Sequence, residues 1–303
     1  MRSGSLLASV VAMITIATAI PAQKKPAAPR KQPDAKQDAK ARYATVDGLQ
    51  MYYEIHGRGR PLVLLHGAFS NIDTDFGKLL PTLAKNRRII AIEQQAHGRT
   101  ADIARPLTYE QMADNTAELL RRLEIKNADF LGYSMGGAIA TYIAIRHPAL
   151  VRKFVFAGGA VHGPEGFYPE VLEGEEKMKP EDFAGTPWLE AYRRIAPNPR
   201  NWPRLVDKIR ALDLNWKGLR PEEIQLIKAP ALLINGDADV VRPEHAVQMF
   251  RLLGGGVPGD LVGLPRSQLA ILPGTTHVGL IERTDWLLSM VTAFLDAPMP
   301  KAN

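Results

Sequence analysis

Apolar residues in this chain gather in short runs, separated by longer stretches in which apolar residues recur with a helical period. Runs of this length, bounded by glycine, proline or charged residues, are typical of strands buried on both faces of a sheet. The predicted buried strands lie in GRGRPLVLLHG (57–67), RRIIAIE (87–93), ADFLGY (128–133), VRKFVFAGG (151–159), APALLING (229–236) and SQLAILPG (267–274). Before them, ATVDGLQMYYEIHG (44–57) alternates apolar and polar residues, which predicts two strands joined at Asp47-Gly48.

Helical patterns separate these strands. In LTYEQMADNTAELLRRLEI (107–125) the apolar residues follow a helical period, and Thr108 and Gln111 have the spacing of a capping box. MGGAIATYIAIRH (135–147) and RTDWLLSMVTAFLD (283–296) are further helical patterns. Short strands that alternate with helices predict an α/β fold with a mostly parallel sheet and helices on both faces.

One segment breaks this alternation. Residues 163–221 lack a strand pattern and are rich in Pro, Glu and Arg. Three of the four tryptophans fall in it: Trp188, Trp202 and Trp216. Because the segment lies between two predicted strands, at the sheet edge where ligands bind, we predict a helical cap over a core of residues 43–162 and 222–298. The tryptophans either line a substrate pocket or hold the cap together.

The first 42 residues have a different composition. MRSGS is short and basic, LLASVVAMITIATAI (6–20) is apolar, and IPAQ ends the run with small residues. This pattern is typical of a signal peptide, here residues 1–22 with cleavage after Ala22, and it predicts a periplasmic or extracellular protein with no stable membrane span after processing. The alternative is an uncleaved N-terminal anchor, for which the apolar run is short. Residues 23–42 form a basic Lys/Ala/Pro linker that we expect to be disordered.

Composition excludes several classes of function. The chain has no cysteine, which excludes disulfides, thiolate catalysis and cysteine-bound metals. The formal net charge is +6, but eight of the 38 basic residues and only two of the 32 acidic residues lie in residues 1–42. The rest of the chain is therefore balanced, and nucleic-acid binding is not expected. Phosphate-loop and dinucleotide-binding motifs are absent from the sequence, and we expect no cofactor and no metal.

A lone serine among glycines is the strongest chemical signal. In LGYSMGGAIA, Ser134 falls between a predicted strand and a predicted helix, in the pattern Gly-x-Ser-x-Gly of a nucleophile elbow. The sharp turn leaves no room for side chains at the flanking positions, which explains the glycines. It also exposes the hydroxyl at the positive end of a helix, where a developing anion is stabilised.

A serine nucleophile needs a base and an acid that orients the base. Of the seven histidines, His277 directly follows the last predicted strand, so we predict that it is the base. Asp237 and Asp239 both follow the strand in APALLING, at the same edge of the sheet, and either could be the acid. The chain order Ser, Asp, His is that of one hydrolase fold.

These motifs together resemble the α/β-hydrolase superfamily over residues 43–297. LVLLHGAFS resembles its oxyanion loop, GYSMGG its elbow, GDADVVRP its acid loop and LPGTTHVGLIERTDWL its histidine loop. The resemblance implies the α/β-hydrolase fold, and it selects Asp239 over Asp237 because the family's acid is the second aspartate, ahead of a proline.

The resemblance also implies an oxyanion hole of two backbone N–H groups. One belongs to Met135, and the other to Ala68, with Phe69 as the alternative; His66 then shapes this loop rather than taking part in catalysis. EQQAHGRT (93–100) departs from the family pattern Asp-x-x-Gly-His-Gly-x-Ser, but that loop is structural in most relatives. The Gly/Pro-rich segment 254–267 is expected to be a surface loop.

The expected reaction is hydrolysis of carboxylic esters of small to medium apolar molecules through an acyl-enzyme. A serine nucleophile excludes the relatives that use aspartate, which are haloalkane dehalogenases and epoxide hydrolases. C–C bond hydrolases and cofactor-free perhydrolases share the triad and stay open as alternatives. A further alternative is a catalytically inactive binding protein on this fold, which would have no need of all three residues.

Overall fold

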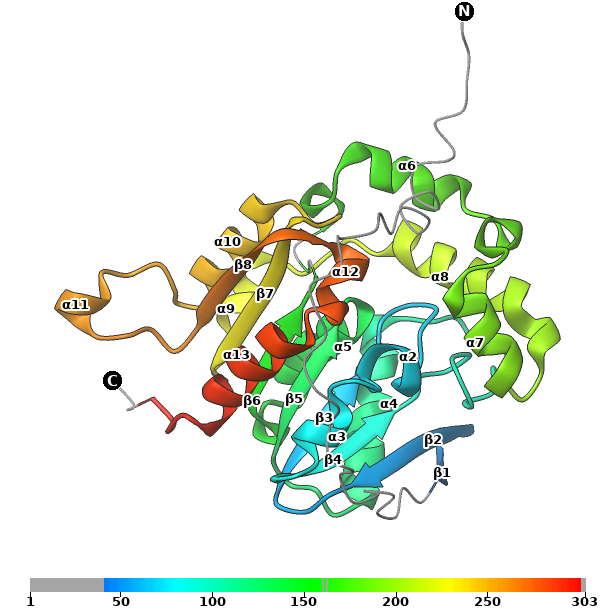
Figure 1. Ribbon diagram of the computed structural model, residues 1–303, viewed down its shortest axis with the longest axis horizontal. Helices are drawn as coiled ribbons and strands as arrows, with labels where there is room; N and C mark the ends of the chain where they lie inside the picture. The colour runs from blue at the N-terminus through cyan, green and yellow to red at the C-terminus, as the bar shows by residue number, and fades with distance from the viewer. Residues whose placement is uncertain (1–40, 160, 162, 301–303) are drawn as a thin grey trace, which may run out of the picture.

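The computed structural model describes residues 41–159, 161 and 163–300 (Figure 1). The predicted signal peptide, residues 1–22, lies outside the described residues, and so does nearly all of the predicted linker, residues 23–42. The first strand begins at Arg42, the last residue of that linker. Among the described residues, no helix combines the length and the apolar character needed to cross a bilayer.

Within the described residues, eight strands form one sheet in the order β1-β2-β4-β3-β5-β6-β7-β8. The first hairpin is antiparallel, β2 also runs antiparallel to β4, and the other neighbouring strands are parallel. The strands are β1 (Arg42–Val46), β2 (Leu49–His56), β3 (Arg60–Leu65), β4 (Arg87–Ile92), β5 (Ala128–Tyr133), β6 (Val151–Ala157), β7 (Ala231–Ala238) and β8 (Gln268–Thr276). Each predicted strand is present, and the sheet is mostly parallel as expected.

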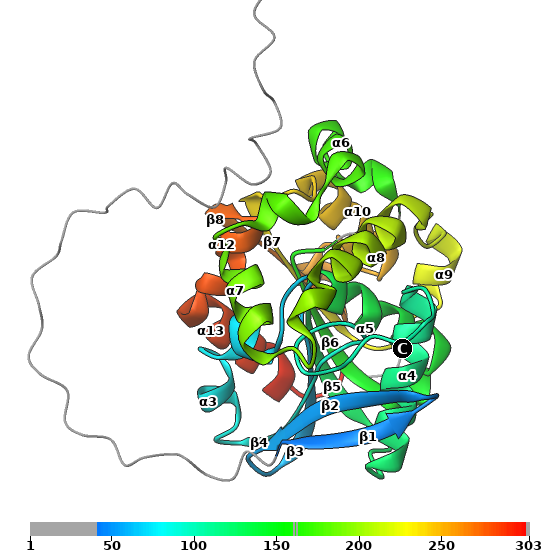
Figure 2. The same ribbon diagram turned by 90° about the vertical axis from the view of Figure 1, so that its right-hand side faces the viewer.

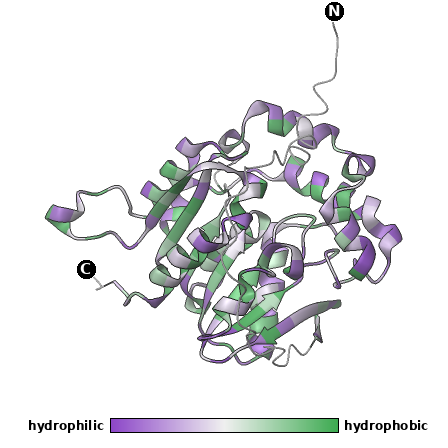
Figure 3. Cartoon of the chain, in the orientation of Figure 1, coloured by the Kyte–Doolittle hydropathy of each residue, from purple (hydrophilic) through white to green (hydrophobic). Residues whose placement is uncertain are grey.

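Helices cover both faces of the sheet (Figure 1, Figure 2). One face packs against α4 (Tyr109–Arg122), α5 (Met135–Arg146) and α10 (Pro243–Leu252), and the other against α2 (Ile72–Phe76), α3 (Leu80–Leu83), α12 (His277–Glu282) and α13 (Thr284–Asp296). Successive strand residues serve opposite faces, so Phe130 packs into one core and Leu131 into the other. The central strands are accordingly largely apolar (Figure 3), although Asp129 lies in β5 and Lys153 in β6.

A helical segment follows β6 and precedes β7. It contains α6 (Pro169–Lys177), α7 (Pro187–Ile195), α8 (Trp202–Asn215) and α9 (Pro221–Gln225), with the short 3-10 helices η2 (Pro164–Gly166), η3 (Pro180–Phe183) and η4 (Pro199–Asn201). We call residues 164–225 the cap. The Trp202 ring packs against the rings of Phe183 and Tyr192, with centroids 5.2 Å apart in both cases, and holds the cap together.

Two details of the surface refine the predictions. The Thr108 side chain accepts a hydrogen bond from the Gln111 N–H at 3.1 Å, but the Gln111 amide donates to Asn115 Oδ1 at 3.0 Å instead of closing the capping box. The Gly/Pro-rich segment projects from the body as a loop that contains α11 (Gly259–Val262), where the Leu261 side chain is 84% exposed (Figure 1). The remaining short helix, η1 (Pro148–Leu150), links α5 to β6.

Candidate active site

Ser134 lies at the turn between β5 and α5, and its backbone is strained. It is one of few residues other than glycine with a positive φ, at φ 53° and ψ −121°. Such a conformation costs on the order of 1–3 kcal/mol and persists only where its surroundings enforce it. The Ser134 N–H donates to Ala157 O on the neighbouring strand β6 at 2.8 Å, which helps to fix the turn.

The two glycines that flank Ser134 are required by close backbone contacts. A Cβ atom on Gly132 would lie 2.2 Å from Gly136 O, and one on Gly136 would lie 1.9 Å from Leu65 O, at the end of β3. Neither distance is possible between non-bonded atoms. The sequence-based explanation of these glycines is therefore confirmed sterically.

Gly136→Ala should lower both stability and activity, because its Cβ would push against the backbone that leads into the predicted oxyanion loop. Overpacking of this kind costs about 1–3 kcal/mol, measurable by urea denaturation. Gly259→Ala is the matched control, because its Cβ would make only an ordinary contact at 3.4 Å. Equal stability of the two variants would contradict this steric argument.

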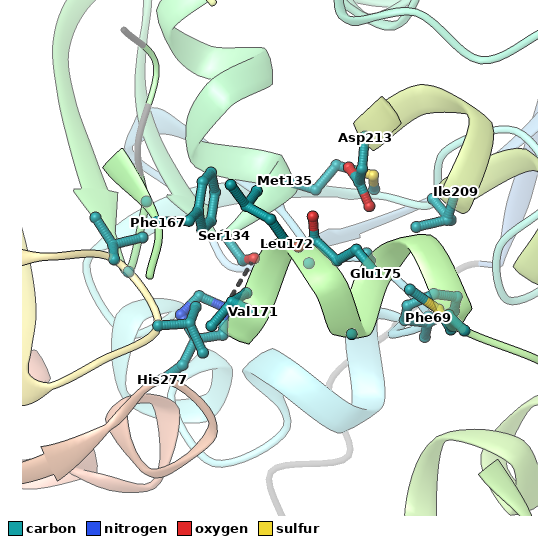
Figure 4. A pocket seen from close by; sticks show the side chains of 18 of the residues that line it. Phe69, Ser134, Met135, Phe167, Val171, Leu172, Glu175, Ile209, Asp213 and His277 are labelled. Carbon is teal, nitrogen blue, oxygen red and sulfur yellow. Dashed lines mark hydrogen bonds between the residues drawn. The ribbon is translucent and has the colours of Figure 1, made fainter. Parts of the chain in front are cut away.

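The structure brings Ser134, His277 and Asp239 into one hydrogen-bonded chain (Figure 4 includes the first two). His277 Nε2 lies 3.0 Å from Ser134 Oγ, and His277 Nδ1 lies 2.8 Å from Asp239 Oδ1. Asp239 follows β7 and His277 follows β8, so three strand ends supply the three side chains. The Val241 N–H donates to Asp239 Oδ1 at 3.1 Å and fixes the orientation of the carboxylate.

The electrostatics of this chain suit a base and its orienting acid. Burial lowers the pKa of His277, but the negative charge of Asp239 and the hydrogen bond to it outweigh burial, so the pKa lies above its ordinary value of 6.5. Burial raises the pKa of Asp239, but the charge and hydrogen bond of His277 keep it below 3.8. Asp239 is therefore ionised at neutral pH, and His277 can switch between its two states.

Asp237 lies apart from this chain. Its exposed carboxylate accepts a hydrogen bond from the Thr275 N–H at 3.0 Å, and backbone N–H groups lower its pKa, first among them that of Thr275.

Sequence reasoning missed a further neighbour of the histidine, Tyr133. Its ring stacks on the His277 ring with centroids 5.4 Å apart, and its hydroxyl donates to His277 O at 3.0 Å. The only sequence signal for Tyr133 was its position directly before Ser134.

The predicted oxyanion residues border the same cavity as the serine. Gly67, Ala68, Phe69 and Met135 all line it. The Gly67 N–H donates to Asp75 Oδ2 at 2.8 Å, whereas no hydrogen bond to a described residue uses the N–H groups of Ala68, Phe69 or Met135. These N–H groups can therefore donate hydrogen bonds to a ligand oxygen.

Asp75 is a second residue that sequence reasoning missed. Burial raises its pKa to about 6, and the Gly67 N–H and the Ser70 hydroxyl partly offset that effect. The residue anchors the predicted oxyanion loop from behind through its bond to Gly67. Its place in α2, just after the loop, was the only sequence signal.

His66 stabilises the loop from the other side. Its Nε2 accepts from the Gln94 N–H at 3.0 Å, so Nδ1 is the donor to Gly67 O, 2.7 Å away. Burial lowers the His66 pKa to about 4, which keeps the ring neutral.

Glu93, which replaces the family's aspartate, is fully buried and accepts from Arg99 Nη1 at 2.7 Å. Residues 93–100 do not line the cavity, and they pack as structural support.

A cavity of about 400 Å³ lies between Ser134 and the cap (Figure 4). Apolar side chains form much of its wall, among them Phe167, Val171, Leu172 and Ile209. Of the three cap tryptophans, Trp188 and Trp216 line it and Trp202 does not. The cap arginines also lie elsewhere: none of Arg193, Arg194, Arg200, Arg204 and Arg210 lines the cavity. Among the described residues, no group of three or more His, Asp or Glu side chains is placed to hold a metal.

Comparison with known proteins identifies the family of this chain. The sequence pattern of the family described as alpha/beta hydrolase fold matches residues 60–194. Pyrrolizixenacetamide deacetylase of Xenorhabdus hominickii is 30% identical over 267 residues, which cover 82% of this chain and 96% of that protein. The chain belongs to the α/β-hydrolase superfamily.

Two further known proteins are similar to this chain. Pimeloyl-[acyl-carrier protein] methyl ester esterase of Yersinia enterocolitica is 24% identical over 275 residues, covering 81% of this α/β-hydrolase and 97% of the esterase. A solved meta-cleavage product hydrolase of Pseudomonas fluorescens has a TM-score of 0.61 at 20% identity, with 84% of this chain and 97% of that chain covered. The structural likeness supports the fold alone.

Proposed function

We propose that this α/β-hydrolase is a serine-dependent carboxylic ester hydrolase with Ser134, Asp239 and His277 as its catalytic triad. The observation that carries the proposal is the hydrogen-bonded chain from Asp239 through His277 to Ser134, which ends at a largely apolar cavity. The cavity volume of about 400 Å³ suits a small to medium substrate. The deacetylase and the methyl ester esterase among the relatives act on acyl compounds by name, which agrees with this reaction class.

The geometry suggests the following steps. His277 Nε2 takes the Ser134 proton as the hydroxyl oxygen attacks the ester carbonyl, and Asp239 stabilises the resulting imidazolium. The N–H groups of Met135 and of Ala68 or Phe69 bind the oxyanion. Collapse of the tetrahedral intermediate breaks the bond to the alcohol, which takes the proton from His277. Water activated by His277 then hydrolyses the acyl-enzyme.

Cleavage of C–C bonds in ring-fission products is the main competing reaction. Such substrates are anionic acids, which a fixed cation would help to bind. The only lysine that lines the cavity, Lys177, is exposed and pairs with Glu173 at 3.5 Å, and no arginine lines it within the described residues. The absence of an arginine from this wall favours neutral or cationic substrates.

The ester activity should exceed any C–C activity by a wide margin. We expect kcat/KM on p-nitrophenyl butyrate or hexanoate within the usual enzyme range of about 10⁴–10⁸ M⁻¹s⁻¹. Purified protein is compared on these esters and on a vinylogous diketone-acid ring-cleavage product. Ester turnover below roughly 10² M⁻¹s⁻¹ together with clear diketone cleavage would overturn the proposal.

A further assay, peracid formation, and the ester assay itself distinguish two other functions. A perhydrolase would form peracid from acetate and hydrogen peroxide faster than it hydrolyses esters. A binding protein would turn over none of these compounds, although the aligned triad gives no reason to expect that.

We propose a periplasmic or extracellular site of action, on the strength of the N-terminal sequence pattern.

Ester hydrolysis should rise with pH in the range where His277 loses its proton. Only the neutral imidazole can accept the serine proton, and its pKa is raised above 6.5, so half-maximal kcat/KM is expected above pH 6.5. Asp239 stays ionised over this range because its pKa is lowered. The profile is measured on p-nitrophenyl butyrate with correction for spontaneous hydrolysis. A half-maximum below pH 6.5 would argue against this assignment of the base.

A further inference from the structure

Two carboxyl groups interrupt the apolar roof of the cavity. Glu175 lies on α6 and Asp213 on α8, and their side chains point toward one another in Figure 4. Both residues line the cavity, and both are half-buried. The pair therefore lies within the same enclosed space as Ser134 and His277.

The pair has no basic partner. Within the described residues, neither carboxyl group takes part in a side-chain hydrogen bond or an ion pair, whereas several other charged residues of the cap are paired on its surface. Arg193 bonds Glu190 at 2.9 Å, and Arg210 bonds Asp207 at 2.9 Å, both on the outside of the cap. The five carboxylic residues of the cavity wall face one lysine and His277: they are Glu170, Glu173, Glu175, Asp182 and Asp213. The cavity wall is thus acidic as well as apolar.

Burial makes ionisation of the two carboxyl groups unfavourable. Burial raises the pKa of Glu175 to about 7, and burial together with the charge of Glu175 raises that of Asp213 well above its ordinary value of 3.8. The pair therefore retains a proton near neutral pH. Because two apolar residues would stabilise the cap better, a role in holding the fold does not explain the pair. Carboxyl groups that line the same cavity as a nucleophile and have raised pKa values are candidates for binding a ligand.

We propose that Glu175 and Asp213 form a subsite for a protonated amine, and that the natural substrates are esters carrying an ammonium group. This inference rests on the proposed ester hydrolysis and names its substrate class. The ammonium N–H groups donate to the carboxylate oxygens, and the proton held by the pair is released to solvent or passes to an amine that arrives neutral. The apolar wall packs against the carbon chain between the amine and the ester.

Matched pairs of esters test the subsite. Dimethylaminoethyl butyrate and isoamyl butyrate differ in that a protonated nitrogen replaces a CH group, and p-nitrophenyl esters of dimethylaminobutyric acid and its carbon isostere place the same change on the acyl side. We expect kcat/KM to favour the cation by roughly ten- to a hundredfold in at least one pair, the range for hydrogen bonds to a charged group. A ratio near one in both pairs would overturn the proposal.

Isosteric variants assign the preference to the two residues. Glu175→Gln and Asp213→Asn together should reduce the cation-to-isostere ratio at least tenfold. Glu176→Gln is the control, because Glu176 is exposed on the same helix and does not line the cavity, and it should leave the ratio unchanged. An unchanged ratio in the double variant would refute the role of the pair. Thermal melting checks that each variant folds.

A binding measurement separates this proposal from the proposed ester hydrolysis. Isothermal titration of Ser134→Ala with the intact dimethylaminoethyl and isoamyl esters reports recognition without turnover. Tighter binding of the cationic ester, lost when Glu175→Gln and Asp213→Asn are added, supports the subsite even if no ester is hydrolysed by the wild type. Equal binding of both esters refutes the subsite even if ester hydrolysis is confirmed.

Discussion

Replacing Ser134 with alanine should lower ester turnover by about 10⁶-fold, the loss measured for comparable nucleophile removals in another serine hydrolase. The loss is large because Ser134 Oγ is the only hydroxyl hydrogen-bonded to His277 Nε2 among the described residues, at 3.0 Å. Without it, His277 and the backbone N–H groups of the loop can act only on water. Turnover of p-nitrophenyl butyrate by both proteins measures the effect.

The fold should survive this change. Ser134→Ala removes one oxygen that faces the cavity and leaves the strained backbone as it is. Ser289→Ala, at an exposed position on α13, is the matched control and should keep wild-type activity. A fluorophosphonate should label the wild type and this control but not Ser134→Ala. If Ser134→Ala retained more than a hundredth of the wild-type turnover, Ser134 would not be the nucleophile.

The elements that position the site could be predicted from sequence because their signals are local. Each buried strand is a short apolar run, and the elbow glycines report a backbone contact that only glycine permits. Because each follows a predicted strand, Ser134, His277 and the two candidate aspartates were expected at one edge of the sheet, and the family resemblance selected Asp239. In the structure these side chains form one hydrogen-bonded chain.

The cap could not be predicted to the same depth, because its contacts depend on how its helices cross. Sequence left open whether the three tryptophans line the cavity, and the structure divides them: Trp188 and Trp216 do, whereas Trp202 packs against Phe183 and Tyr192. An apolar pocket was expected from these aromatic residues. The two acids in its roof lie on different helices, α6 and α8, and neither residue belongs to a motif.

Small polar residues near the site were also beyond a sequence pattern. Asp75 contacts the Gly67 N–H through a turn whose shape depends on the left-handed backbone of Phe69, at φ 63°. Gln111 has capping-box spacing, but its side chain donates to Asn115 Oδ1, one turn further along the helix, and does not accept from the Thr108 N–H. Competition among neighbouring groups of this kind is decided by geometry rather than by residue type.

Asp239→Asn should cost about 10⁴-fold in turnover, whereas Asp237→Asn should cost less than about tenfold. An amide at position 239 can offer an N–H group to His277 Nδ1, which then accepts, and the proton moves to Nε2, where it blocks attack by Ser134. The charge that holds the His277 pKa above 6.5 is lost as well. Asp237 instead contacts the Thr275 N–H, 3.0 Å away near the end of β8, so an amide at position 237 keeps the triad intact.

The pH profile distinguishes this role from a structural one. Neutralising Asp239 removes the largest influences that raise the His277 pKa, and the smaller effects of Asp75 and Glu175 remain against burial. The remaining activity should therefore reach half its maximum at a lower pH than in the wild type. Asp237→Asn should leave the midpoint where it is, because Asp237 does not contact the histidine. Both variants are assayed on p-nitrophenyl butyrate across the same pH range. Equal losses in the two variants, or an unshifted midpoint in Asp239→Asn, would mean that another group orients His277.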